Sequence, residues 1–198
     1  MTALAKSADW ISPEEYLAGE KDADVRHEYV NGQVYAMAGA TRTHNRIATN
    51  LNGQLYNHLR GHRCESFIND IKVRIPPQFA NLFYYPDVIV ACTPEEEGDE
   101  YYLDKPVIIV EVLSDSTEQT DRREKMLAYR QVPSVEIYVL IEQKRIAATV
   151  LRRAETGWRS EALEGPDAIL LMEPIEFEAP LGTLYERTRL AAESSPRL

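Results

Sequence analysis

Two acidic residues interrupt hydrophobic segments of the chain. Asp87 leads directly into the run VIV, and Glu111 interrupts the apolar segment at 107–113. A carboxylate in a buried strand is costly unless it is paired, protonated or bound to a metal. On neighbouring strands the two acids would converge on one hard cation, and Mg²⁺ takes one or two carboxylates with water and substrate phosphate. An equally weighted alternative places Asp87 at an exposed strand end and pairs Glu111 with an arginine.

A lysine that could act beside these acids lies on a predicted helix rather than on the strand. Strand periodicity puts Leu113 on the same face as Glu111, so no lysine follows Glu111 on that strand. Asp121, Lys125 and Tyr129 instead follow each other at i, i+4 and i+8, which places them on one helical stripe. Lys125 could orient an attacking water or stabilise charge on a phosphate. The alternative is a surface pair of Asp121 and Lys125, which would contribute about 0.2–0.5 kcal/mol.

Two further polar residues are weaker candidates for supporting roles. His44 lies near the start of a predicted helix, in line with Ile47 and Leu51, and a helix N-terminus favours a phosphate group. A lone histidine there is more often a cap or a core residue. Glu28 precedes the predicted turn at Asn31-Gly32 and could be a further acid that positions metal or water.

The elements that would carry these residues alternate between helices and strands. A capping box at Ser12 and Glu15 predicts a short helix within the first 24 residues, and Asn31-Gly32 predicts a β-hairpin. Apolar residues spaced by four predict a helix over 43–60, and a second capping box at Ser116 opens a helix to about Gln131. Further strands are expected at 63–68, 70–75, 83–92, 106–114, 135–142 and 145–153, with strand and loop closing the sheet in the C-terminal third. Pro86 suggests that the segment 83–92 is an edge strand or contains a strand start. This order is a mixed α/β arrangement in one domain.

Composition narrows the class of protein. The 22 Lys and Arg against 32 Asp and Glu give a net charge of −10, which argues against non-specific coating of nucleic acid. However, the segments 41–74 and 121–130 together hold ten basic and four acidic residues, so a locally basic face is possible.

Two cysteines cannot make a disulfide scaffold and suit a reducing cytoplasm. No apolar stretch approaches a membrane span, and the N-terminus lacks the apolar run of a secretory signal. P-loop, nucleophile-elbow and zinc-protease motifs are missing from the sequence.

The two acidic segments, YYPDVIV and IIVEVLS, resemble the PD-(D/E)XK nuclease signature and, more specifically, the Uma-two family of restriction-endonuclease-like proteins. The family pattern is matched by Glu28, Gly32, His44, Pro86-Asp87, 111–114 (EVLS), Ser116-Thr117, Asp121, Lys125, Tyr129 and Pro133. The resemblance covers roughly residues 10–155 and departs from the family where an aspartate often ends the strand at Ile141-Glu142. It implies a central mixed sheet flanked by helices with an N-terminal hairpin, in one domain over 1–198.

The function implied by the resemblance is hydrolysis of DNA phosphodiester bonds with Mg²⁺ or Mn²⁺. Asp87 and Glu111 would hold the metal with the backbone carbonyl of Val112, and Lys125 would replace the lysine missing from the strand. Glu28 and His44 would support them. We expect weak, metal-dependent binding of DNA and a homodimer, without a membrane partner. Two alternatives remain open, namely an inactive nucleic-acid-binding or regulatory protein and a structural oligomer whose acids pair with arginines.

Overall fold

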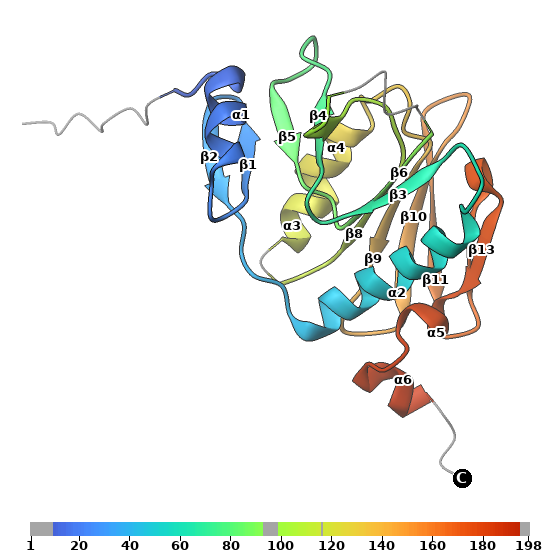
Figure 1. The fold of residues 1–198 in the computed structure, drawn as a ribbon. Helices are drawn as coiled ribbons and strands as arrows, with labels where there is room; N and C mark the ends of the chain where they lie inside the picture. The colour runs from blue at the N-terminus through green and yellow to red at the C-terminus, as the bar shows by residue number, and fades with distance from the viewer. Residues whose placement is uncertain (1–9, 93–98, 116, 195–198) are drawn as a thin grey trace, which may run out of the picture.

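The computed structural model describes residues 10–92, 99–115 and 117–194, and it arranges them as helices around two mixed β-sheets (Figure 1). The helices are α1 (Pro13–Lys21), α2 (Arg42–His58), α3 (Glu118–Thr120), α4 (Met126–Tyr129), α5 (Leu181–Leu184) and α6 (Arg189–Ser194). The strands are β1 (His27–Val30), β2 (Gln33–Ala36), β3 (Glu65–Ile68), β4 (Lys72–Ile75), β5 (Leu82–Tyr84), β6 (Val88–Ala91), β7 (Tyr102–Leu103), β8 (Pro106–Val112), β9 (Ile137–Ile141), β10 (Ala147–Arg153), β11 (Trp158–Glu164), β12 (Ile169–Met172) and β13 (Phe177–Pro180). Across these ranges no helix is long and apolar enough to cross a membrane.

The larger sheet has the order β11-β10-β9-β8-β6-β3, and β8 and β9 are its parallel pair. The smaller sheet has the order β2-β1-β5-β4-β7. In the larger sheet β6 runs antiparallel to β8, with Val88 opposite Val110 and Ile89 opposite Ile109. The start of β6 therefore lies beside the end of β8.

Alternation of side chains along β6 and β8 builds a core on each face of the larger sheet. Val88, Val90 and Val110 face α2, the β12–β13 hairpin and α5, whereas Ile89 and Ile109 face α4 and the smaller sheet. Both strands are covered on both faces, which explains why their sequences are almost continuously apolar.

The capping box and the Asn31-Gly32 turn predicted from the sequence are both present, at the start of α1 and between β1 and β2. Ser12 and Glu15 form the reciprocal capping box at the start of α1. Asn31 and Gly32 both have positive φ, at 47° and 91°, as the two-residue turn between β1 and β2 requires. The buried Glu20 side chain accepts a hydrogen bond from the backbone N–H of His27 at 2.8 Å, which ties α1 to the beginning of β1.

The expectation of one strand over 83–92 is wrong. The segment contributes β5 to the smaller sheet and β6 to the larger sheet, with the break at Tyr85-Pro86-Asp87. Pro86 has no N–H for a ladder hydrogen bond, so the chain leaves one sheet before it and enters the other after it. The strand start expected at Pro86 is thus present, but β6 lies between β8 and β3 rather than at an edge.

The helix expected from Ser116 to Gln131 is composite. Ser116 lies outside the described residues, and the N-cap residue Thr117 makes no capping hydrogen bond through its side chain. Between α3 and α4 the chain forms a π-helical turn, η2 (Asp121–Lys125).

The C-terminal third differs from the expected closure of one sheet. β11 extends the larger sheet, but β12 and β13 form a separate hairpin, and α5 and α6 are helices. Asn50 on α2 donates hydrogen bonds to the carbonyls of Leu184 and Glu186 at 2.9 and 3.0 Å. This C-terminal segment therefore fixes the position of α2.

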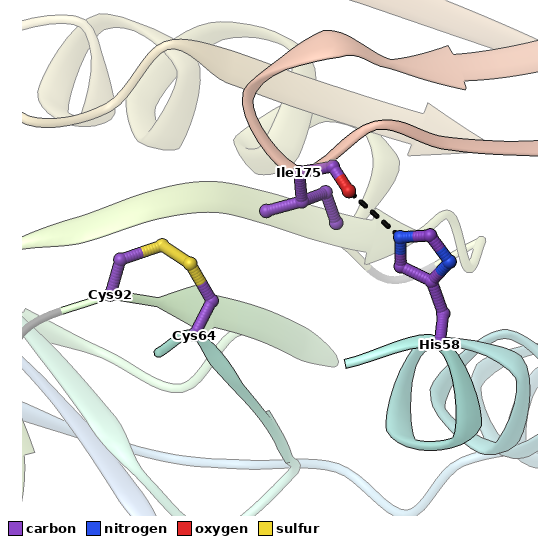
Figure 2. Close-up of a disulfide and its surroundings, with 4 residues drawn as sticks. All are labelled: His58, Cys64, Cys92 and Ile175. Atoms are coloured by element: carbon purple, nitrogen blue, oxygen red, sulfur yellow. Dashed lines mark hydrogen bonds between the residues drawn. A yellow bond between two sulfur atoms is a disulfide. The ribbon is translucent and has the colours of Figure 1, made fainter. Parts of the chain in front are cut away.

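Contrary to the expectation of cysteines suited to a reducing cytoplasm, Cys64, just before β3, forms a disulfide with Cys92, just after β6 (Figure 2). Glu65 on β3 pairs with Ala91 on β6, so the register brings Cys64 opposite Cys92. This bond lies at the end of β6 remote from Asp87. The same view shows His58, in the last turn of α2, bonded through Nε2 to the carbonyl oxygen of Ile175 at 2.8 Å.

Candidate active site

Asp87 and Glu111 are brought together by the antiparallel register of β6 and β8. Because Val88 pairs with Val110, Asp87, which directly precedes β6, lies opposite Glu111 on β8. The backbone N–H of Val112 donates to Oδ2 of Asp87 at 2.7 Å, which fixes the aspartate against β8. The expectation that the two strands carrying these acids lie side by side is confirmed.

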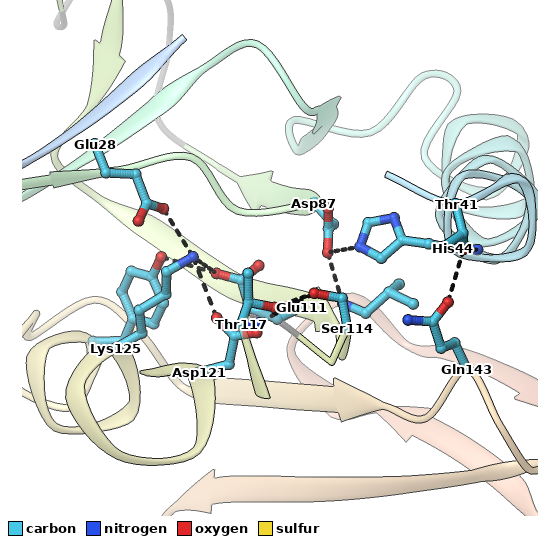
Figure 3. Close-up of polar contacts among 12 residues, drawn as sticks. Glu28, Thr41, His44, Asp87, Glu111, Ser114, Thr117, Asp121, Lys125 and Gln143 are labelled. Atoms are coloured by element: carbon cyan, nitrogen blue, oxygen red, sulfur yellow. Dashed lines mark hydrogen bonds and ion pairs between the residues drawn. The ribbon is translucent and has the colours of Figure 1, made fainter. Parts of the chain in front are cut away.

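Lys125 lies among three carboxylates in a buried cluster (Figure 3). Its Nζ donates a hydrogen bond to Oε1 of Glu111 at 3.2 Å and lies at ion-pair distance from Glu28 (2.8 Å) and Asp121 (3.3 Å). Burial disfavours the charged ammonium, but the carboxylates outweigh it and hold the pKa of Lys125 well above its ordinary range. Lys125 is therefore a permanent positive charge at this site. The alternative of an exposed Asp121–Lys125 pair is wrong, because Asp121 and Lys125 are only 1 % and 4 % exposed.

The helical segment after β8 positions this lysine. Asp121 and Lys125 begin and end the π-helical turn η2, and Tyr129 follows at the end of α4. All three side chains are buried against the sheet, and the Tyr129 hydroxyl donates to Oε1 of Glu111 at 3.2 Å. The Tyr138 hydroxyl on β9 donates to the backbone carbonyl of Asp121 at 3.1 Å and anchors the turn. Single π-helical turns are often found at functional sites.

His44 reaches Asp87 from the first turn of α2. Its Nε2 lies 3.1 Å from Oδ2 of Asp87. Burial lowers the pKa of His44, but the hydrogen bond and the charge of Asp87 outweigh burial, so the net shift is upward. The Val112 carbonyl faces the same ring and raises its pKa further. His44 thus supports Asp87 directly and is not only a core residue.

The start of α2 is held by a contact across the chain. Thr41 is the N-cap residue, and its hydroxyl oxygen accepts from the backbone N–H of His44 at 3.1 Å. The same hydroxyl donates to Oε1 of Gln143, after β9, at 2.8 Å. Gln143 therefore positions the cap of α2 and, through it, the histidine beside Asp87.

These residues line a cavity of about 490 Å³ between the β1–β2 side of the molecule and the turn after β9. Asp87, Glu111, His44 and Lys125 contribute to its wall, whereas Glu28 and Asp121 lie behind Lys125. The cluster holds four carboxylates against one lysine and one histidine. Burial is the main cause of the raised pKa of Glu111, and the charges of Asp121, Asp87 and Glu28 raise it further against the opposing effect of Lys125. This excess of acidic groups is an environment that a bound cation would relieve.

The carboxylate pair has oxygens available for a cation. The contacts of Asp87 fall on Oδ2, and those of Glu111 fall on Oε1 (Figure 3). Within the described ranges, neither Asp87 Oδ1 nor Glu111 Oε2 receives a hydrogen bond or an ion pair. In those same ranges no three His, Cys, Asp or Glu side chains converge as a metal site. The donor set therefore fits a cation such as Mg²⁺ that takes only two carboxylates and completes its shell with carbonyl, water or phosphate oxygens.

Sequence reasoning missed several residues that complete the cluster. The Tyr84 ring, on β5, lies 5.5 Å from the Lys125 ammonium in a cation–π contact. Asp121 and Tyr129 were recognisable by their helical spacing with Lys125, but only the structure shows both acting on the buried lysine or on Glu111. The link from Gln143 to Thr41 has no signal in the sequence, because it joins residues separated by 102 positions.

The fold is that of a nuclease-like protein. The chain shares its fold with a solved structure from Anabaena variabilis ATCC 29413, described as "a putative nuclease belonging to DUF820". The two superpose with a TM-score of 0.73 and 18 % identity, over 88 % of this chain and 97 % of that chain.

The chain belongs to the Uma2 family, described as "Putative restriction endonuclease", whose model matches residues 13–182. Two relatives are proteins of Synechocystis sp. that are both described as uncharacterized. The protein slr1290 is 36 % identical over 161 residues, or 79 % of this chain and 83 % of the relative. The protein sll1609 is 30 % identical over 135 residues, or 67 % and 75 %. The resemblance to the Uma-two family and the restriction-endonuclease-like mixed α/β fold are thereby confirmed.

Proposed function

We propose that the protein is a metal-dependent endonuclease that hydrolyses DNA phosphodiester bonds. The observation that carries the proposal is the position of Asp87 opposite Glu111 at the wall of a cavity, with the charged Lys125 ammonium on Glu111. Membership in the family described as "Putative restriction endonuclease" supports the same reaction class.

Asp87, Glu111 and the Val112 carbonyl are the groups that would hold Mg²⁺ or Mn²⁺. When bound, such an ion supplies positive charge for the scissile phosphate and makes water a stronger nucleophile near neutral pH. Lys125 keeps its proton, so it stabilises negative charge and orients water, and it is not a general base. His44 holds Asp87 in place, and Glu28 holds the ammonium from the opposite side. A homodimer that cuts both strands is part of the same proposal.

The test is cleavage of supercoiled plasmid DNA in Mg²⁺, in Mn²⁺ and in EDTA. We expect wild-type protein to nick and linearise the plasmid with either metal and to be inactive in EDTA. Glu111→Gln should abolish cleavage, because it removes a metal ligand with little change in volume. Glu161→Gln, on exposed β11, makes the same charge change outside the cluster and should cleave as wild type.

A second candidate function is that of a DNA-binding protein without catalysis. The observation that favours it is the lysine placement, because Lys125 and Tyr129 already occupy Oε1 of Glu111. Salt-dependent DNA binding that is unaffected by metal, with no cleavage in any condition, would establish this candidate and refute the endonuclease.

A further inference from the structure

Two exposed ion pairs lie at the edge of the cavity. Arg26, just before β1, pairs through Nε with Oδ1 of Asp70 at 3.3 Å, and both residues line the cavity. Lys144, in the turn after β9, pairs with Asp115, which lines the cavity together with Gln143. The two pairs come from opposite ends of the site, one beside the strand of Glu28 and one beside the cap of α2.

The basic residues deeper in the cavity are already engaged by the carboxylates of the site. Lys125 is buried and surrounded by carboxylates, and His44 is held by Asp87. Among the described lining residues this leaves Arg26, with 43 % of its side chain exposed, as the cation that solvent reaches. Lys144 is more exposed still, at 71 % of its side chain.

We propose that Arg26 and Lys144 bind phosphates of the nucleic acid strand that enters the cavity, and that Asp70 and Asp115 hold them when no nucleic acid is bound. The proposal rests on the proposed function, which supplies the phosphodiester ligand. An exposed ion pair contributes little free energy, so a phosphate displaces the aspartate at small cost. The displaced aspartates then lie near the backbone and repel it. The pairs therefore keep the affinity low and restrict the contact to a few phosphates.

The test measures binding without cleavage, by fluorescence anisotropy of a labelled 16-mer DNA in EDTA and again in Ca²⁺, over a series of KCl concentrations. Arg26→Ala should weaken binding and reduce the slope of log K against log salt by about 1. Asp70→Asn should tighten binding by about twofold to fivefold, since it frees the arginine and removes a repulsive charge. Lys144→Ala and Asp115→Asn should act in the same two directions. Glu161→Gln changes net charge as Asp70→Asn does, but away from the cavity, and should bind as wild type.

The decisive variant is the double substitution of Arg26→Ala with Asp70→Asn. If the aspartate acts by holding the arginine, most of the gain from Asp70→Asn disappears when Arg26 is absent. An equal gain in both backgrounds, or the same gain from Glu161→Gln, would overturn the proposal, as would a wild-type protein that binds no DNA at low salt. Plasmid cleavage separates the two proposals. If wild type cleaves the plasmid but all four single variants bind DNA as wild type does, the phosphate contacts are refuted and the endonuclease is not. If the variants bind as expected but wild type does not cleave, the endonuclease is refuted and the phosphate contacts are not.

Discussion

Replacing Lys125 by methionine removes the ammonium group that lies between three carboxylates while keeping the length of the side chain. At distances of 2.8, 3.2 and 3.3 Å, each attraction amounts to about 5 kcal/mol at an effective dielectric constant of 20. Desolvation of the lysine offsets much of this sum. Removal of one partner from a buried pair costs about 3–5 kcal/mol, because the remaining charges stay buried without compensation. We expect Lys125→Met to lower the free energy of unfolding at pH 7.5 by this amount.

The assay is urea unfolding followed by circular dichroism. With a slope of about 2–3 kcal/mol per molar, the loss corresponds to a midpoint about 1–2 M lower. The loss must also depend on pH. The pKa values of Glu111 and Asp121 are already raised by burial, and without the lysine they rise further. Both acids are therefore protonated more readily as the pH falls, and the difference between variant and wild type should shrink clearly between pH 7.5 and pH 5.

The matched control is Lys144→Met, which makes the same substitution in an exposed ion pair and should leave the unfolding midpoint unchanged at both pH values. The reasoning is refuted if Lys125→Met shifts the midpoint by less than about 0.3 M at pH 7.5. A loss of equal size at both pH values would also refute it, because that result would point to lost packing rather than to uncompensated carboxylates.

Three further measurements test the site. The folded pKa of Glu111 is raised, so its contribution to stability is present below about pH 4.5 and is lost as the pH rises; Glu111→Gln should therefore gain stability relative to wild type at pH 8 in urea unfolding, and a loss there would contradict the pKa shift. The folded pKa of His44 is also raised, so its contribution to stability is likewise lost as the pH rises. His44→Gln should therefore lose more stability at pH 6 than at pH 8.5. A larger loss at pH 8.5 would count against the ion pair with Asp87. Saturating Mn²⁺, at about 100 times its Kd, should stabilise wild type by about 2.7 kcal/mol. Calorimetric titration should show no such binding to Asp87→Ala, and unchanged binding there would remove Asp87 from the metal site.

The sequence predicted the carboxylate pair because its signal is local. An acid inside an apolar strand is anomalous wherever that strand lies, and two such strands adjacent in the chain often pair. The capping box of α1 and the Asn31-Gly32 turn were predicted for the same reason, since the required conformations depend on a few neighbouring residues. The assignment of residues 1–198 to one domain remains a prediction.

The surroundings of Lys125 could not be predicted, because they depend on packing between the two sheets. Glu28 lies in the smaller sheet, Glu111 in the larger sheet, and Asp121 on the helical segment between β8 and β9. Helical spacing alone favoured an exposed Asp121–Lys125 pair. The π-helical turn is also invisible to periodicity, because spacing by four fits both kinds of helix over so few residues.

Glu142 stands where the Uma-two family often has an aspartate at the end of the strand. In the structure, Glu142 Oε1 accepts from Arg122 Nη2 at 2.6 Å and lies 3.6 Å from Arg145. Arg122 follows Asp121 in the π-helical turn, so the glutamate ties the end of β9 to the turn that positions Lys125. Substitution of Glu142 is therefore expected to act on the site through this turn.

The structure shows where part of the net charge of −10 is located. Four of the acids form the cluster around Lys125 and His44, where a cation would offset them, and Asp70 and Asp115 hold the exposed cations at the edge of the cavity. The acidity therefore does not oppose a nucleic acid evenly over the surface. At the edge of the cavity, affinity should depend on exchange of aspartate for phosphate at Arg26 and Lys144. Such exchange is favoured at low ionic strength, because the phosphate contacts release counterions from the nucleic acid.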